Sequence, residues 1–383
     1  MNSEETAAAY RELSSKYHTD AWTEPIGVTD HLEALSQVLE SGGDYSTTFE
    51  YDRSAVAAYA DDWSAFRDDL RDADMSELIR DRVIEEIQEK LECSTLLTQG
   101  GDEAYTEFQR QRIGLPEPEL VAMAQTILDG DLSVLPFHVC ASEDGEESIT
   151  SAHVQSLMSQ ALGAYGLEEW YAVEEPNMAA RASVNGSLHR VRVRQGTLFT
   201  QCAADRLLAH EIGGHVLRWA NSQNQPEAWA SIALGRTVAT EEGMAAWREV
   251  QFNLLTEEQI RVYAARVIAV DTAQKEGLLG VARRIADFVD PQQAAEIAVR
   301  TKRGLKNPDN LGGMTKDWGY LAGLLAMADL AQNAPDNLRL LAGVKWPVDD
   351  LPLICQLHKQ GAIVEPELVP DRVRLGLSSS TSQ

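Results

Sequence analysis

The chain has 383 residues, of which 44% are hydrophobic and 24% charged, a composition typical of a folded globular protein rather than a disordered one. It carries 60 acidic and 33 basic residues and a formal charge of −27. This charge argues against general binding of nucleic acids or anionic membranes, since both need a basic surface.

Three features of the sequence favour a reduced, cytoplasmic protein. The first residues form neither a basic nor an apolar segment, so no secretory signal is expected. No apolar run approaches the roughly 18 residues that are needed to span a bilayer. The four cysteines lie far apart, at Cys93, Cys140, Cys202 and Cys355, which disfavours a disulfide framework and a cysteine-type zinc site.

The first part of the chain, residues 1–98, is expected to be an acidic helical region. Helical spacing of apolar residues occurs in the windows 55–70, 76–91, 117–129 and 150–165. Gly100-Gly101 interrupts the pattern, and the polar run 144–147 predicts a loop between the last two helices.

Strand-like composition begins at Trp170. Residues 170–173 are rich in β-formers, and residues 181–194 predict a hairpin, because Asn185-Gly186 lies between two strand-like runs. In the second run Val191 and Val193 alternate with arginines, as expected for a strand with one buried face. These runs predict a small sheet.

Helical spacing returns after the sheet and continues almost to the C-terminus. The expected helices cover residues 202–221, 239–255, 257–271, 275–289, 291–304 and 315–331. Prolines interrupt the segment after residue 345, and residues 378–383 are expected to be frayed. The chain therefore reads as mostly helical.

The most informative segment is an apolar helical window in which His210 and His215 flank Glu211, one residue further apart than in the familiar zinc-peptidase pattern. On a regular helix, residues five apart lie about 140° apart, which would point one imidazole away from a shared metal. A widened π-type turn would bring both rings to one side. Gly213-Gly214 relaxes the local steric limits, at a helix cost of about 1 kcal/mol each. We therefore expect a bulge here that closes a two-histidine site.

A catalytic zinc takes three protein ligands and a water, so a third ligand is expected from another element. Glu241 and Glu242 open the next predicted helix. Because adjacent residues lie about 100° apart, only one of them is expected to face the metal. Periodicity leaves the choice open, and the other would be a favourable charge at a helix N-terminus.

These motifs, in this order, resemble those of the tyrosine carboxypeptidase-like zinc peptidases, which include the microtubule-associated tyrosine carboxypeptidases. The resemblance rests on residues 210–218, 221, 225–226, 240–245, 300–305 and 315–323. It implies an α+β, mostly helical, zincin-like fold with a small antiparallel sheet beside the metal-binding helix. The catalytic domain would cover 99–345, and a C-terminal extension with a frayed end would cover 346–383.

Carried over residue by residue, the resemblance implies that His210, His215 and Glu242 bind Zn²⁺. The glutamate directly before glycine is the one that the family shares, which favours Glu242 over Glu241. Glu211 would be the catalytic base that takes a proton from water and passes it to the leaving amine. The expected function is a zinc carboxypeptidase that releases a C-terminal, Tyr-like residue from a peptide or protein.

Further candidates come from the needs of that reaction. Tyr320 is the candidate second electrophile for the oxyanion, with a packing role as the alternative. Arg303, Lys302 and Lys316 are candidates for binding the substrate carboxylate, with ordinary surface positions as the alternative. The strand 188–194 is a candidate for aligning an extended peptide by backbone pairing.

Three other functions stay open at this point. The chain could be a zinc endopeptidase or aminopeptidase. It could be a zinc-binding regulatory or interaction protein, although such a site has no need for Glu211. It could also be a hydrolase that uses another divalent metal, since two histidines and a glutamate accept several ions.

Overall fold

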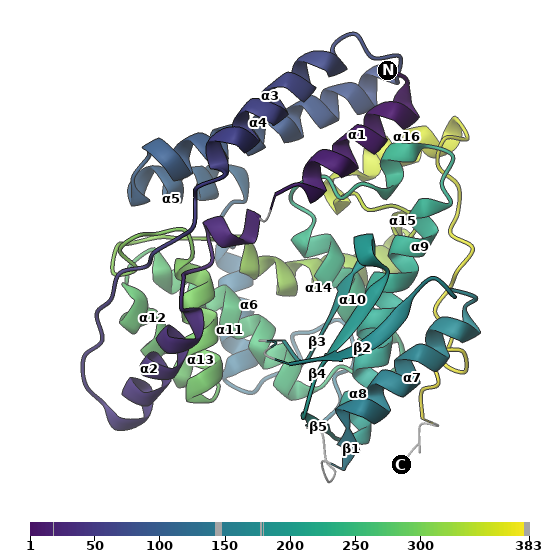
Figure 1. Cartoon of the computed structure of the whole chain (residues 1–383). Coiled ribbons are helices and arrows are strands. Elements are labelled where there is room, and N and C mark those ends of the chain that lie inside the picture. The colour runs from purple at the N-terminus through teal and green to yellow at the C-terminus, as the bar shows by residue number, and fades with distance from the viewer. Residues whose placement is uncertain (18, 142–147, 177, 179, 379–383) are drawn as a thin grey trace. The chain divides into compact units, whose positions relative to one another are not determined.

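A computed structural model of the chain describes residues 1–17, 19–141, 148–176, 178 and 180–378 (Figure 1). This part is mostly helical and contains two small sheets, which confirms the expected mostly helical α+β class. The predicted loop at 144–147 and the last five residues of the predicted frayed end lie outside the described residues. None of the described helices combines the length and the apolar character needed to cross a bilayer.

The chain folds into two compact units, each of which draws on segments far apart in the sequence. The first comprises Met1–Val134, Leu234–Arg236 and Arg261–Leu321, and the second comprises Leu135–Ala233, Thr237–Ile260 and Ala322–Gln383. The units therefore interleave along the chain, whereas the predicted parts 1–98, 99–345 and 346–383 are continuous stretches.

The regular secondary structure described in the first unit is helical. Its helices are α1 (Ser3–Ser15), α2 (Val28–Ser41), α3 (Val56–Leu70), α4 (Glu77–Gln99), α5 (Asp102–Arg112), α6 (Pro118–Leu128), α12 (Leu278–Ala286), α13 (Pro291–Lys302) and most of α11 (Glu257–Ala273). The long helices α3 and α4 run side by side (Figure 1). Trp63 of α3 and Ile87 of α4 are buried, and the Tyr10 ring of α1 packs edge-on against Trp63.

Each predicted helical window holds a helix, and most ends agree within a few residues. The largest difference is α4, which continues to Gln99 because neither glycine nor proline interrupts it before Gly100. Three helices were not predicted: α5, α15 (Pro335–Leu341) and α16 (Leu351–Lys359). Both α15 and α16 carry a proline in the first turn, where its fixed φ favours a helix rather than interrupting one.

The main sheet of the second unit has three strands, β2 (Tyr171–Glu175), β3 (Ala182–Asn185) and β4 (Arg190–Arg194), in the order β2-β4-β3. A separate two-stranded sheet pairs β1 (Ile149–Thr150) with β5 (Leu198–Phe199). The predicted hairpin is present, since β3 and β4 are antiparallel. The prediction of a wholly antiparallel sheet is wrong, because β2 and β4 are parallel. After β2 the chain forms β3 at the opposite edge of the sheet. It then forms β4, which lies between β2 and β3.

The hairpin turn is longer than the predicted two-residue Asn-Gly turn. Its 3₁₀ turn covers Gly186–Leu188, and the Asn185 side chain accepts a hydrogen bond from the Leu188 N–H. A Cβ on Gly186 would lie 2.4 Å from the Trp219 ring. The glycine therefore permits close packing against Trp219 rather than a tight turn.

The helices of the second unit are α7 (Ser151–Ala164), α8 (Gln201–Leu207), the π-helix η3 (Leu208–Val216), α9 (Leu217–Gln223), α10 (Val238–Gln251), α15, α16 and most of α14 (Gly319–Asn333). One hydrophobic core cluster of this unit draws on its sheet and on α7, α8, η3 and α9. Val191 and Val193 of β4 are fully buried in this core together with Ile212 and Val216 of η3. The sheet therefore supports the π-helix directly.

The C-terminal tail is held by two side-chain amides, one in α9 and one just past its end. Asn221 exchanges two hydrogen bonds with the backbone of Leu368, at 2.8 and 2.9 Å. Gln225 does the same with Val364, at 3.1 and 2.8 Å. Each side-chain amide pairs with the backbone of one tail residue through two hydrogen bonds, as the backbone of a neighbouring strand would. This pairing gives both residues a structural role after the histidine motif.

Candidate metal centre

The helix that carries the two histidines widens where the spacing predicts it. The chain is α-helical in α8, π-helical in η3 and α-helical again in α9, without a break. At the end of η3 the Leu217 N–H donates to the carbonyl of Ile212, five residues earlier. The rings of His210 and His215 are 5.1 Å apart between centroids. The extra residue is therefore absorbed by the wider winding, and both rings lie on one side.

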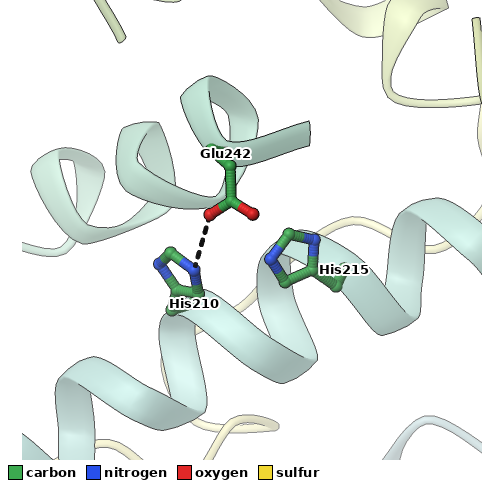
Figure 2. A group of neighbouring side chains, drawn as sticks. All are labelled: His210, His215 and Glu242. Carbon is green, nitrogen blue, oxygen red and sulfur yellow. Dashed lines mark ion pairs between the residues drawn. The ribbon is translucent and has the colours of Figure 1, made fainter. Parts of the chain in front are cut away.

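His210 and His215 meet Glu242, which α10 supplies from the facing side (Figure 2). One ligand atom from each residue lies within 4.8 Å of the other two. His210 Nε2 is 3.7 Å from Glu242 Oε2. Within the described part of the chain, no other group of three or more His, Cys, Asp or Glu residues has this geometry.

Glycines let α10 approach the π-helix closely enough for this meeting. A Cβ on Gly214 would lie 2.6 Å from the Cα of Ala245 on α10. On the other side of α10, a Cβ on Gly243 would lie 2.4 Å from the carbonyl carbon of Gly323 on α14. Gly214 thus has a packing role beyond the steric freedom that the sequence suggested.

A second carboxylate from α10 contacts His210. Glu249 Oε1 accepts a hydrogen bond of 2.6 Å from His210 Nδ1, and Arg206 Nη1 lies 3.7 Å from the same oxygen. Burial alone lowers the pKa of His210, but hydrogen bonds to Glu242 and Glu249 outweigh it and raise the pKa to about 10. A metal ion at this site would therefore compete with a proton on His210.

Glu241 is held by two cations. Its Oε1 lies 2.6 Å from Arg218 Nη1 and 2.5 Å from Lys345 Nζ, and its Oε2 lies 3.5 Å from His215 Nδ1. Burial raises the pKa of Glu241, but the charges of Arg218 and Lys345 outweigh it and hold the pKa well below its ordinary value. The structure therefore distinguishes the two adjacent glutamates. Glu242 faces both imidazoles, whereas Glu241 faces Arg218 and Lys345.

The donor set suits a divalent metal. Two imidazoles and one carboxylate are a set that zinc takes in catalytic sites. The Nδ1 of His210 is already used by Glu249, so its Nε2 is the atom left facing the cluster. Glu211 is next to His210 in η3, and its side chain is buried. The predicted roles of these four residues stay predictions, and their geometry is compatible with them.

The other predicted residues lie in the first unit, whereas the cluster lies in the second. Lys302 does not have the predicted role, because it is fully buried and its Nζ donates to the carbonyls of Glu276 and Asn310 at 2.7 and 2.8 Å, and to Ala273 at 3.4 Å. These three hydrogen bonds use all of its protons.

Arg303, Lys316 and Tyr320 stay predictions. Arg303 Nη2 lies 3.3 Å from Glu24 Oε1. The Tyr320 ring lies under the guanidinium of Arg266, 3.9 Å from the ring centre, and beside Tyr263. Lys316 begins a 3₁₀ turn that leads into α14. The predicted peptide-aligning role of the strand 188–194 is wrong, because β4 is the central strand and is paired on both sides.

Sequence reasoning missed Glu249, Arg206 and Lys345. A signal existed for Glu249, which follows Glu242 by seven residues and so shares its helix face. Arg206 precedes His210 by four residues and also shares a face with it. Nothing in the sequence pattern connects Lys345 with Glu241.

The fold and the cluster together define a class: a mostly helical α+β protein in which a widened histidine helix and α10 bring together two histidines and a glutamate that could hold a metal ion. The family model described as microtubule-associated tyrosine carboxypeptidase matches residues 39–381. The chain belongs to this family, which confirms the resemblance and places it among carboxypeptidases, hydrolases that act on peptides or proteins. A comparison with curated proteins finds no match.

Proposed function

We propose that this chain is a zinc-dependent carboxypeptidase that releases a C-terminal, Tyr-like residue from a peptide or protein. The observation that carries the proposal is the meeting of His210, His215 and Glu242 on one side of a π-helix that also contains Glu211. Family membership supports the carboxypeptidase reaction, and the donor set supports zinc.

Each residue of the proposed site has its own role in the reaction. His210, His215 and Glu242 would hold the ion through two imidazole nitrogens and a carboxylate oxygen. A bound zinc ion supplies Lewis acidity to the scissile carbonyl and to water. Glu211 takes the proton of the attacking water and delivers it to the leaving amine. Arg303 and Lys316 stay the proposed partners of the substrate carboxylate, and Tyr320 the proposed donor to the oxyanion.

The decisive test compares the parent protein with Glu211→Gln, which keeps the shape of the side chain but cannot accept the proton. We expect both to bind one equivalent of zinc, and kcat/KM of the variant to fall at least about 100-fold, the usual contribution of a general base. A variant that retains full activity would remove Glu211 from the reaction. His215→Ala is the matched loss-of-metal control, in which zinc and activity should disappear together.

The choice of peptide separates the alternatives. An N-blocked peptide ending in free Tyr should be cleaved, and the same peptide ending in Tyr amide should not, because a carboxypeptidase recognises the terminal carboxylate. Cleavage of both would favour an endopeptidase, and cleavage only of a peptide with a free N-terminus an aminopeptidase. Zinc binding without any hydrolysis would favour a regulatory protein. Reconstitution of the metal-free protein with other divalent ions tests the metal assignment.

A further inference from the structure

We infer that Glu249 is a positioning residue that fixes the ring of His210 for metal binding, supported from behind by Arg206. The inference rests on the proposed function in one respect, namely that a metal binds at His210, His215 and Glu242. It concerns a residue that makes up no part of that ligand set.

The hydrogen bond indicates which nitrogen of His210 keeps its proton when a metal binds the other nitrogen. An ionised carboxylate can only accept, so the 2.6 Å contact requires that His210 Nδ1 donates to Glu249 Oε1. The lone pair of the neutral ring then lies on Nε2, which points toward Glu242. Histidine ligands of metals generally donate their second N–H in this way, which fixes both the tautomer and the ring orientation.

Helix geometry places the two carboxylates on the same side of α10. Glu242 and Glu249 are seven residues apart, close to two full turns, so they share a face and are separated along the axis by about 10 Å. The imidazole of His210 lies between them, with one ring nitrogen toward each. The ring can therefore neither flip nor tilt without losing one of these contacts.

The buried position of Glu249 carries a free-energy cost that an interaction of its carboxylate must offset. Its side chain is fully buried. No described residue hydrogen-bonds to its second oxygen, Oε2. Burying a carboxylate is costly without full pairing, and Arg206 Nη1 lies 3.7 Å from Oε1. The partner that accounts for the buried charge is the imidazole.

His215 provides an internal comparison, because its outer contact is weaker. Glu241 Oε2 is 3.5 Å from His215 Nδ1, beyond the usual length of a good hydrogen bond. The other oxygen of Glu241 is bound to Arg218 and Lys345. We therefore expect removal of the Glu241 charge to affect metal binding less than removal of the Glu249 side chain.

A purely structural role is the competing explanation, in which Glu249 only pairs with Arg206 to join α8 and α10. That role predicts a lower unfolding temperature with unchanged affinity for metal. The positioning role predicts weaker metal binding even in variants that fold normally. Metal affinity therefore distinguishes the two.

The experiment measures zinc affinity by competition with a chromophoric chelator for the parent, Glu249→Ala, Glu249→Gln and Glu241→Gln. Glu86→Gln is the matched control, because Glu86 is another buried glutamate on a helix, in the first unit. We expect Glu249→Ala to weaken zinc binding about 10- to 100-fold. Glu249→Gln should weaken it less, since its amide oxygen still accepts the bond. Glu241→Gln and Glu86→Gln should stay within threefold of the parent.

Visible absorption of the cobalt-loaded proteins gives a second readout, because the bands report ligand geometry. They should shift in Glu249→Ala and not in Glu86→Gln. A zinc affinity of Glu249→Ala within threefold of the parent would overturn the inference, and so would an equal loss in Glu86→Gln. If Glu249→Ala does not fold, the isosteric Glu249→Gln carries the same test, and a parent-like affinity and cobalt spectrum in it would then overturn the inference.

The outcome is separable from that of the proposed function. A parent that binds zinc in a Glu249-dependent manner but releases no C-terminal residue supports the inference and overturns the proposed activity. A parent that hydrolyses C-terminal Tyr peptides but binds zinc independently of Glu249 does the reverse.

Discussion

Arg300 and Asp317 come from the two later sequence blocks on which the family resemblance rests, and they meet in a bidentate ion pair. Arg300 Nε is 2.7 Å from Asp317 Oδ2, and Arg300 Nη2 is 3.0 Å from Oδ1. Burial raises the pKa of Asp317, but the charge and hydrogen bonds of Arg300 outweigh it and hold the pKa well below its ordinary value. These two motif residues therefore act on each other and stabilise the first unit.

The lowered pKa predicts how this pair depends on pH. Because the folded protein binds the proton of Asp317 less well than the unfolded chain, the stabilisation is complete above a pH of about 4 and is lost as the pH falls toward the lowered pKa. Asp317→Asn should lower the free energy of unfolding by about 3 kcal/mol at pH 7, the low end for a broken buried pair because Arg300 is partly exposed.

Urea unfolding at a series of pH values tests this prediction. The difference between parent and Asp317→Asn should shrink as the solution is acidified below a pH of about 4. A difference that stays constant across that range would show that Asp317 contributes through its shape and not its charge.

At the scale of elements, the distance between η3 and α10 decides whether the three ligands meet. Gly214 lies at the contact with Ala245, where a Cβ would come within 2.6 Å of backbone. Gly213 faces the other way, and among its three nearest neighbours a Cβ would meet side-chain atoms of Leu375 and Pro370, at ordinary contact distances of 3.4 Å or more. The two adjacent glycines therefore differ in role, because Gly214 allows close packing of the two helices and Gly213 does not.

This pair gives a matched prediction. Gly214→Ala should push α10 away, destabilise the protein by about 1–3 kcal/mol as overpacking does, and weaken zinc binding. Gly213→Ala should bind zinc normally and be neutral or slightly more stable, because alanine favours a helix by about 1 kcal/mol over glycine. Unfolding curves and zinc titrations measure both effects, and equal behaviour of the two variants would contradict the packing explanation.

At the scale of the whole chain, the C-terminal tail completes a core that begins some two hundred residues earlier. Leu375 is fully buried in the same cluster as Ile212 and Val216 of the π-helix. Ser378 N–H donates to Asp205 in α8, just before η3. The tail therefore packs against the helix that carries His210 and His215, the proposed metal ligands.

Shortening the buried tail residue tests that support. Leu375→Ala should lower the free energy of unfolding by about 2–5 kcal/mol, as expected for a large-to-small core substitution. Val373→Ala, two residues away and 85% exposed, should change it by no more than about 0.5 kcal/mol. Chemical denaturation measures both, and a neutral Leu375→Ala would show that the tail only covers the unit and does not stabilise it.

Much of the fold was predictable from local pattern. Apolar spacing located the long helices, and the Asn185-Gly186 signal located the hairpin, since these elements depend mainly on neighbouring residues. The direction of β2 was not predictable, because strand pairing is settled by the path of the chain between strands. Helices α15 and α16 were missed because a proline in a first turn looks the same in the sequence as a proline that interrupts a helix.

The sequence by itself determined that two histidines five residues apart need a widened helix to share a metal, because the angle per residue of a regular helix is fixed. Only the tertiary structure shows that Glu242 faces both imidazoles while Glu241 faces Arg218 and Lys345, since periodicity does not place those two cations. It also gave Lys302 its buried carbonyl partners and brought Glu249 to His210. These contacts join residues of different elements, and the only local signal among them is the seven-residue spacing that puts Glu249 on the same helix face as Glu242.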